Sequence, residues 1–380
     1  MTQLTRTHKV WIELSAAALT ANVATIRRRL KPTTALFAVV KSNAYGHGIY
    51  AIAPLLARIG VDGFCVDSVV EASRLRESGI TQAILVIGPT LPSLYDTAAA
   101  HDITLSISSL YELEQLIAWQ KQSGKKLPFH IKVETGMHRR GFALADLAAA
   151  LAQITENSLS IAGIYSHFAA SKDSDHLEHN AKQQAVFDKA IATAAAAGYN
   201  SLLKHLGATS STLIDPRYEY DAVRIGIGLY GIFPSEKLEG RYIAETPFEP
   251  ILSMRAVISE INTVTAGEGI GYDLTETVNR ETRVAIVPIG YWHGIPRALS
   301  SRATLLVGGK RAKILGLISM DMMALDVTDI DCRPGDTVTI IGTDGAEKNT
   351  ARSLGLIAST TPHEILVRLN PLIERSVVYW

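Results

Sequence analysis

The sequence predicts an α/β protein in which a (β/α)8 barrel, the TIM barrel, is followed by a mostly β C-terminal domain. In the first part of the chain, eight short apolar runs alternate with amphipathic stretches, which is the pattern of parallel strands covered by helices. After Gly231, helical signals become sparse, and strand-like runs are separated by Gly-Gly, Pro-Gly and Asp-Gly pairs. We therefore expect the barrel in residues 14–235 and the β domain in residues 236–380.

The elements of the predicted barrel follow one another in a regular order. Residues 15–31 carry apolar side chains at helical spacing, and three consecutive arginines near their end suit a helix C-terminus. Amphipathic stretches such as residues 109–122 and 144–154 lie between most of the apolar runs. A doubly wound open sheet is the alternative for any such alternation, and the count of eight favours the barrel. The eight runs cover residues 35–41, 63–67, 83–89, 103–108, 129–134, 161–167, 202–207 and 222–227.

The predicted β domain has one clear helical stretch, at residues 349–357. Its other ordered segments are short and apolar, as is typical of strands between turns. These strand-like runs cover residues 254–264, 283–288, 303–307, 312–318, 323–327 and 337–341.

Composition limits the classes of function. With 380 residues, 47% hydrophobic and 19% charged, the chain has an ordinary globular composition, and its zero net charge indicates neither nucleic acid nor an acidic membrane surface as partner. No stretch is apolar enough to span a bilayer, and the N-terminus lacks the apolar core of a signal peptide. Cys65 and Cys332 match no metal-binding spacing. We therefore expect no metal site and interpret them as reduced thiols of a cytoplasmic protein.

A lysine stands at the exit of the first predicted strand. Lys41 ends an apolar run, and Asn43 with the glycines behind it turns the chain at once. Reduced access to water there would favour the neutral amine that Schiff-base chemistry needs, although a surface lysine at a strand end is the alternative. Glu134, His167 and Thr209 stand at or just past other strand ends, where the chemistry of barrels collects.

The stretch around Lys41 reads Ala38-Val39-Val40-Lys41-Ser42-Asn43-Ala44-Tyr45-Gly46-His47-Gly48. It closely resembles the pyridoxal phosphate (PLP) lysine motif of the alanine racemase family. The resemblance implies that Lys41 binds PLP covalently and that Tyr45 hydrogen-bonds the cofactor phosphate. It also implies a barrel followed by a β domain, with an N-terminal strand in residues 1–13 that joins the β domain.

Two further barrel segments carry the resemblance. The segment Lys132-Val133-Glu134-Thr135-Gly136-Met137-His138-Arg139 resembles a family motif that ends in an arginine near the substrate carboxylate, so Arg139 would make that contact. Lys132 matches a lysine that is often carbamylated in the family and positions this arginine; an ordinary charged residue of the barrel interior is the alternative. His167 matches the histidine that packs on the PLP ring, and a hydrogen-bonded core histidine is the alternative.

Arg224 matches the family arginine that faces the pyridine nitrogen of PLP. A guanidinium only donates hydrogen bonds and stays charged, so the ring nitrogen would remain unprotonated. PLP would then be a weaker electron sink, which favours racemisation over transamination. A buried ion-pair member is the alternative for Arg224. The resemblance further implies that the phosphate is bound by the amides of Gly226 and Ile227 and the hydroxyl of Thr209.

The second domain carries two more motifs. Gly269-Ile270-Gly271-Tyr272 resembles the motif of the catalytic tyrosine, and Ser319-Met320-Asp321 resembles a Cys-Met-Asp motif whose methionine amide binds the substrate carboxylate. Asp321 and Tyr291 would be supporting residues. In the family these segments reach the PLP of the other subunit, so the resemblance implies a homodimer with a shared active site.

These motifs together predict an amino-acid racemase that uses two bases. Lys41 and Tyr272 would stand on opposite faces of the substrate α-carbon, one removing the proton and the other returning it. Arg139 and His167 would help Tyr272 to act as a base. The resemblance implies alanine as substrate and D-alanine for peptidoglycan as product.

Several positions depart from the family pattern. Ala208 replaces an asparagine, Trp292 and His293 replace an Ala-Asp pair, and Val367 replaces a polar or tyrosine residue. These changes leave a racemase of another small amino acid, such as serine, as an alternative. A fold-type III PLP decarboxylase and a non-catalytic PLP-binding barrel are two others. Arg224 and Ser319 argue against the decarboxylase, and the second domain argues against the non-catalytic barrel.

Overall fold

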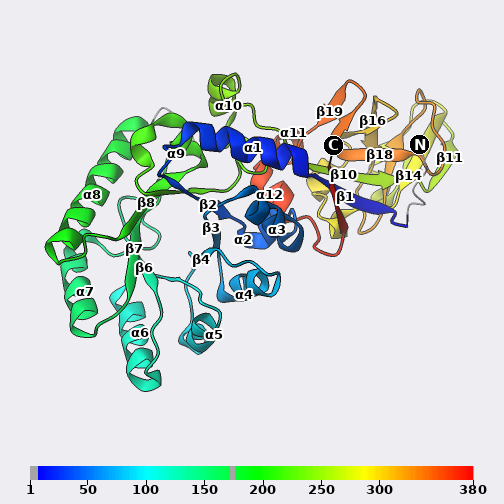
Figure 1. The fold of residues 1–380 in the computed structure, drawn as a ribbon. Helices are drawn as coiled ribbons and strands as arrows, with labels where there is room; N and C mark the ends of the chain where they lie inside the picture. The colour runs from blue at the N-terminus through cyan, green and yellow to red at the C-terminus, as the bar shows by residue number, and fades with distance from the viewer. Residues whose placement is uncertain (1–6, 172–175, 380) are drawn as a thin grey trace. The chain divides into compact units, whose positions relative to one another are not determined.

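The computed structural model describes residues 7–171 and 176–379 (Figure 1). The chain divides into two compact units. The barrel unit comprises Ala17–Ala44 and Ile52–Pro250, and the β unit comprises Met1–Ala16, Tyr45–Ala51 and Ile251–Trp380. The predicted boundary at residues 235 and 236 stays a prediction, and residues 1–6 of the predicted N-terminal segment lie outside the described residues.

The barrel unit contains eight parallel strands in the order β4-β3-β2-β9-β8-β7-β6-β5. The two end strands meet through a parallel bridge between Leu85 and Thr104, which closes the ring. The predicted fold class and all eight predicted strands are confirmed. They are β2 (Ala35–Val39), β3 (Gly63–Val66), β4 (Ala83–Val86), β5 (Leu105–Ile107), β6 (Phe129–Lys132), β7 (Ile161–Tyr165), β8 (Leu203–Ala208) and β9 (Ala222–Ile225).

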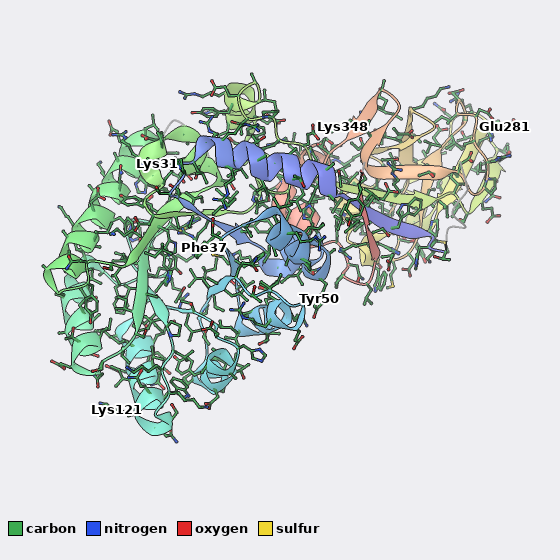
Figure 2. All side chains as sticks on the ribbon, in the orientation of Figure 1. Lys31, Phe37, Tyr50, Lys121, Glu281 and Lys348 are labelled. Carbon is green, nitrogen blue, oxygen red and sulfur yellow. The ribbon has the colours of Figure 1, made fainter. Side chains whose placement is uncertain are left out.

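Burial explains why these strands read as continuous apolar runs. Every residue of β3, β6 and β9 is buried, because one face meets the barrel interior and the other meets the helices. Figure 2 shows Phe37 of β2 among the barrel strands, whereas the exposed Lys121 of helix α6 (Leu110–Ser123) points away from them.

The helices of this part of the chain begin and end at recognisable signals. The side chains of Ser68 and Ser109 cap α4 and α6, and Gly124 ends α6 with a φ of 68°. The predicted helices at residues 15–31, 109–122 and 144–154 are confirmed as α1, α6 and α7. The helices are α1 (Ala16–Arg29), α3 (Ile49–Ile59), α4 (Val69–Glu77), α5 (Tyr95–Ala100), α6 (Leu110–Ser123), α7 (Leu144–Glu156), α8 (Leu177–Ala196), α9 (Thr209–Ile214) and α10 (Glu236–Tyr242).

The β unit is built on a ten-stranded sheet with the path β11-β14-β17-β16-β15-β18-β10-β1-β20, and β19 pairs with β18. The N-terminal strand β1 pairs antiparallel with β10 and parallel with β20, as the resemblance implied. The strands are β1 (Val10–Ser15), β10 (Leu252–Val257), β11 (Glu260–Val264), β14 (Thr282–Val287), β15 (Thr304–Val307), β16 (Lys310–Leu315), β17 (Met323–Asp326), β18 (Thr337–Asp344), β19 (Glu347–Asn349) and β20 (Glu374–Val378).

Smaller elements complete the β unit. The predicted helix at residues 349–357 is confirmed as α11 (Ala351–Ile357), whereas α12 (Pro362–Val367) was not predicted. A separate two-stranded sheet joins β12 (Gly269–Ile270) and β13 (Glu276–Thr277). None of the helices within residues 7–171 and 176–379 has the length and apolar character of a membrane span.

One predicted strand is wrong in the β unit. Residues 254–264 form two strands, β10 and β11, rather than one. The strand is interrupted where the chain changes neighbours: Ile258 donates its N–H to the carbonyl of Asp336 beside β18, whereas Ser259 donates its N–H to the carbonyl of Ile286 of β14.

Candidate active site at the carboxyl ends of the barrel strands

The carboxyl ends of neighbouring barrel strands hold the predicted polar residues. Lys41 follows β2, which pairs with β9, the strand of Arg224. His167 follows β7, and its imidazole lies within reach of the charges of Arg224, Arg139, Lys132 and Lys41. Lys41 itself is half-buried behind the fully buried Val40. The barrel therefore brings these predicted residues to one end.

The turn after Lys41 has an unusual backbone. Ser42, Asn43, Ala44 and Tyr45 all lie in the left-handed region, with φ between 53° and 57°, so the short element α2 (Lys41–Tyr45) is a left-handed turn. For residues with a Cβ atom this conformation costs roughly 1–2 kcal/mol each. Such strain persists only where surrounding contacts hold it, and it is typical of functional sites.

Arg224 is buried and its donors are aimed at neutral acceptors. Its Nη1 donates to Nδ1 of His205 at 2.6 Å and to the His205 carbonyl at 3.1 Å. Its Nη2 donates to the Ser166 carbonyl at 2.7 Å and to Nδ1 of His167 at 3.2 Å, and its carbon Cζ lies 5.0 Å from the centre of the Tyr165 ring. Within the described part of the chain, Nε makes no hydrogen bond, so one donor remains for a bound group.

The partners of Arg224 form a chain of imidazoles that the sequence did not reveal. Because Arg224 can only donate, Nδ1 of His205 accepts, and Nε2 of His205 then donates to Nδ1 of His130 at 2.7 Å. The ring of His205 also stacks on Tyr165, with centroids 4.8 Å apart. A single histidine within an apolar strand is usually interpreted as a core residue, so only the closed barrel shows that the two histidines meet.

These imidazoles are neutral. Burial, and then the charge of Arg224, lowers the pKa of His130 to about 3. The same causes, with smaller ones from other cations, lower the pKa of His167 to about 3 and that of His205 well below its usual value. His167 accepts at Nδ1 and therefore carries its proton at Nε2, which makes it a neutral donor.

The residues predicted to bind the phosphate lie in the segments after β8 and β9. The hydroxyl oxygen of Thr209 accepts from the backbone N–H groups of Gly226 at 3.3 Å and Gly228 at 3.4 Å. A Cβ atom on Gly228 would lie 2.7 Å from Cγ2 of Thr209, so glycine allows this close approach. Ala208, which departs from the family, donates its N–H to the hydroxyl of Ser211 at 2.8 Å.

The segment after β6 carries two consecutive arginines, Arg139 and Arg140, whose side chains have different surroundings. The carboxylate of Glu134 accepts from the N–H groups of Gly136, Met137 and Arg139, which fixes the backbone of the loop. The side chain of Arg139 is exposed. Arg140 instead forms an ion pair with Glu112 at 2.8 Å and binds barrel carbonyls, so it is structural. Arg139 remains the arginine available to a substrate.

Lys132 lies buried beside this loop. Its Nζ donates to the Arg140 carbonyl at 2.5 Å. Burial, and then the charges of Arg139 and Arg140, lowers the pKa of Lys132 to about 8. The amine is thus easier to deprotonate than an ordinary lysine, as carbamylation requires.

The β unit holds the other predicted site residues. Tyr272 is 70% exposed and lines a pocket of about 510 Å³ together with Tyr291, Arg297, Ile318, Ser319 and Met320. Asp321 is exposed and does not line this pocket. The Tyr291 N–H donates to the Ser319 carbonyl at 3.1 Å, which joins the two motifs. Tyr45 also belongs to this unit, where its ring lies 6.0 Å from that of His363.

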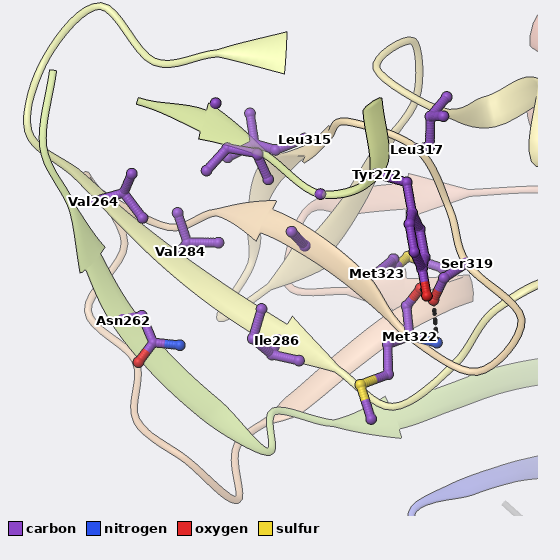
Figure 3. Close-up of a pocket in the computed structure, with 14 residues that line it drawn as sticks. Asn262, Val264, Tyr272, Val284, Ile286, Leu315, Leu317, Ser319, Met322 and Met323 are labelled. Carbon is purple, nitrogen blue, oxygen red and sulfur yellow. Dashed lines mark hydrogen bonds between the residues drawn. The ribbon is translucent and has the colours of Figure 1, made fainter. Parts of the chain in front are cut away.

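A second, mainly apolar pocket is also lined by Tyr272 and measures about 480 Å³. Figure 3 shows Val264, Val284 and Ile286 toward the left and centre of the pocket and Tyr272, Ser319 and Met322 toward its right. The Ser319 hydroxyl donates to the Met322 carbonyl at 2.7 Å, which orders the turn.

Comparisons with known proteins cover both units. Family models match residues 14–234 as "Alanine racemase, N-terminal domain" and residues 251–377 as "Alanine racemase, C-terminal domain". The alanine racemase of Leptospira interrogans is 36% identical over 378 residues, covering 98% of this chain and 96% of the relative. That of Methylacidiphilum infernorum is 33% identical and covers 96% of this chain and 92% of the relative.

Solved structures agree. The alanine racemase of Bacillus anthracis with bound L-Ala-P is 30% identical with a TM-score of 0.91, covering 98% of this chain and 96% of that one. The alanine racemase of Bartonella henselae with covalently bound pyridoxal phosphate is 28% identical with a TM-score of 0.86, and the match covers 98% of this chain and 100% of that one.

The barrel, its site and the appended β domain define an isomerase of the racemase class. The two family models together cover most of the chain, and the alanine racemase of Leptospira interrogans matches 98% of it at 36% identity. The chain belongs to the alanine racemase family, whose members depend on PLP.

Proposed function

We propose that this protein interconverts L-alanine and D-alanine with PLP, in the cytoplasm, and supplies D-alanine for peptidoglycan. Membership of the family and the similarity to alanine racemases along the whole chain support the proposal. The observation that carries it is Arg224, a buried guanidinium with two neutral imidazoles and several carbonyls as partners and one donor, Nε, left over.

The residues present fit the cofactor. The unused donor of Arg224 suits a ring nitrogen that accepts, and Thr209 with the neighbouring amides suits a phosphate. When bound, PLP supplies an electron sink that makes the α-hydrogen of an amino acid acidic. The residues proposed to hold it are Lys41, Tyr45, His167, Thr209, Arg224, Gly226 and Ile227.

The proton moves between two bases of the protein. We assign removal from one enantiomer to Nζ of Lys41 and removal from the other to Oη of Tyr272, each returning the proton that the other has removed. Arg139 and the amide of Met320 would hold the substrate carboxylate, with Lys132 positioning Arg139. Because Arg224 donates without giving up its proton, negative charge at the α-carbon is poorly delocalised, and return of the proton to that carbon is favoured.

The neutral state of His167 refines how Tyr272 becomes a base. A phenol accepts a proton only as phenolate, which nearby positive charge stabilises. His167 is neutral and serves as a donor at Nε2, so it does not supply that charge. Of the two residues expected to help Tyr272, Arg139 is therefore the cation.

We propose that the active form is a homodimer whose subunits share their active sites. The supporting observation is that Tyr272 is 70% exposed and Met320 52% exposed, which leaves both available to a second copy of the chain. Asp321 and Tyr291 would support them.

Incubation of the purified protein with L-alanine in deuterated water tests the proposal. A racemase gives α-deuterated D-alanine, a decarboxylase gives ethylamine, and a PLP carrier gives neither. Tyr272→Phe should slow proton removal from L-alanine by about 10²- to 10⁴-fold, the usual range for loss of a general base, and more than removal from D-alanine. Tyr379→Phe removes another exposed tyrosine of the β unit and should change neither rate. Wild-type rates in both directions for Tyr272→Phe would contradict the two-base assignment.

A further inference from the structure

Arg375, on β20, binds the segment that follows the PLP lysine. Its Nη2 donates to the carbonyl oxygen of Gly46 at 2.9 Å, and its Nε donates to the same oxygen at 3.2 Å. Two parallel N–H groups of one guanidinium therefore converge on a single carbonyl. This fork geometry belongs to arginine, since a lysine ammonium offers only a point charge on a flexible stem.

The other donors of Arg375 are also used by carbonyl oxygens. Nη1 donates to Asn370, Pro371 and Ile373 at 3.2, 3.2 and 2.7 Å, and Nη2 reaches Leu369 at 3.4 Å. Among the residues that the structure describes, no carboxylate pairs with this cation. A guanidinium held only by backbone dipoles serves to fix backbone, because all its hydrogen bonds end on the main chain.

The segment that it holds is seated tightly on the β unit. A Cβ atom on Gly46 would lie 1.8 Å from the Leu366 carbonyl oxygen of α12, and one on Gly48 would lie 2.7 Å from Cδ of Arg375. Both glycines have positive φ, 82° and 100°. Tyr45–Ala51 accordingly belongs to the β unit, although Lys41–Ala44 belongs to the barrel unit.

We propose that Arg375 is a positioning residue for the cofactor phosphate: it holds the Gly46 carbonyl and thereby sets the hydroxyl of the preceding residue, Tyr45. The inference rests on the proposed function, in which Tyr45 binds that phosphate. The left-handed backbone of Tyr45, with φ of 53°, needs outside contacts to persist, and Arg375 supplies one directly after it. No role of this kind was expected for Arg375 from the sequence.

The test compares PLP with pyridoxal, which lacks the phosphate. Cofactor is removed from the purified full-length enzyme, and both compounds are titrated back while the Schiff-base absorbance is followed. Arg375→Lys and Arg375→Met should weaken PLP binding by about 5- to 150-fold, the range for leaving a buried polar group without its partner. Pyridoxal binding should stay as in the wild type. Equal weakening of both compounds, or an unchanged affinity for PLP, would show that Arg375 only stabilises the fold.

Two controls separate the possible failures. The guanidinium of Arg283 also donates, among the described residues, only to carbonyls of the β unit, those of Val327, Ile330 and Cys332, so Arg283→Met should lower stability without changing the ratio of the two affinities. Tyr45→Phe should itself lower PLP affinity and leave pyridoxal unaffected; if it does not, the proposed role of Tyr45 is wrong. If Tyr45→Phe has this effect and the Arg375 variants do not, only the positioning role is wrong. In the double variant Arg375→Lys with Tyr45→Phe, the loss should not exceed that of Tyr45→Phe alone.

Discussion

Three neutral imidazoles inside the barrel make its stability depend on acid. His205 accepts from Arg224 and donates to His130, and His167 accepts from the other side of Arg224. Burial, and then Arg224, lowers the pKa of His130 and of His167 from 6.5 to about 3. Below pH 6.5 the unfolded chain therefore binds protons that the folded barrel excludes.

The size of the effect follows from proton linkage. Since the folded pKa is depressed, each imidazole contributes stability that is fully present above 6.5, the pKa in the unfolded chain, and is lost as the pH falls toward about 3. Within that window one excluded proton lowers the free energy of unfolding by about 1.4 kcal/mol per pH unit. His130→Asn removes one such group while its Oδ1 can still accept from His205. The variant should lose stability less steeply than the wild type, by about 1.4 kcal/mol per pH unit.

Urea unfolding of both proteins between about pH 5.5 and about pH 4.5 measures this difference in slope. Titrating carboxylates and the cofactor act on both proteins alike. Any cavity left by the substitution lowers the free energy of unfolding equally at every pH, so it does not change the slope of that free energy against pH. His176→Asn removes an exposed imidazole, which water solvates in both states, and should leave the slope as in the wild type. If the free energy of unfolding changes with pH at the same slope in the wild type and in His130→Asn, the assignment of His130 as a neutral imidazole that excludes a proton is refuted.

Two further predictions concern the ends of the barrel strands. Because its pKa is lowered to about 8, about a tenth of Lys132 is neutral at about pH 7 and can add CO₂ to form a carbamate with loss of a proton. Carbon-13 NMR of enzyme equilibrated with labelled bicarbonate should show a carbamate signal that Lys132→Arg lacks; the same signal in both proteins would exclude Lys132 as its site. Gly228→Ala places a Cβ atom 2.7 Å from Thr209 and should weaken PLP binding about tenfold, by roughly 1.4 kcal/mol, whereas Gly240→Ala, with open space around it, should not. Equal PLP affinities for the two alanine variants would remove Thr209 from the phosphate site.

The barrel could be predicted because each of its strands gives a recognisable signal in the sequence. Buried parallel strands are apolar on both faces, so each appears as an uninterrupted apolar run. An error of a few residues in a strand boundary does not change the number or the order of the eight strands. The β domain gives weaker signals. The break between β10 and β11 falls at Ile258 and Ser259, within residues 254–264, where no glycine or proline marks the change of neighbour from β18 to β14. Pairing of this kind depends on contacts that are distant in sequence.

The residues of the site also differ in how well the sequence predicts them. Lys41 and Arg224 could be identified because each lies within a motif, whereas His130 and His205 stand alone in apolar strands. The two histidines are 75 residues apart and meet only because β6 and β8 both pair with β7. Arg375 was missed for a related reason. Its function depends on carbonyl oxygens, which every residue carries, so no side chain in the sequence marks its partners.

The departure at His293 changes the charge of the turn and keeps its hydrogen bond. Nδ1 of His293 accepts from the Gly290 N–H at 3.2 Å, a bond that the carboxylate of the usual aspartate could also accept, so the turn that carries Tyr291 keeps its cap. Burial lowers the pKa of His293, which keeps the imidazole neutral. The turn also binds the predicted carboxylate site directly, because the Trp292 N–H donates to the Met320 carbonyl at 3.0 Å. Replacing an anion by a neutral ring therefore removes negative charge beside the place where a substrate carboxylate is proposed to bind, while the backbone that presents Tyr291 and Met320 stays tied together.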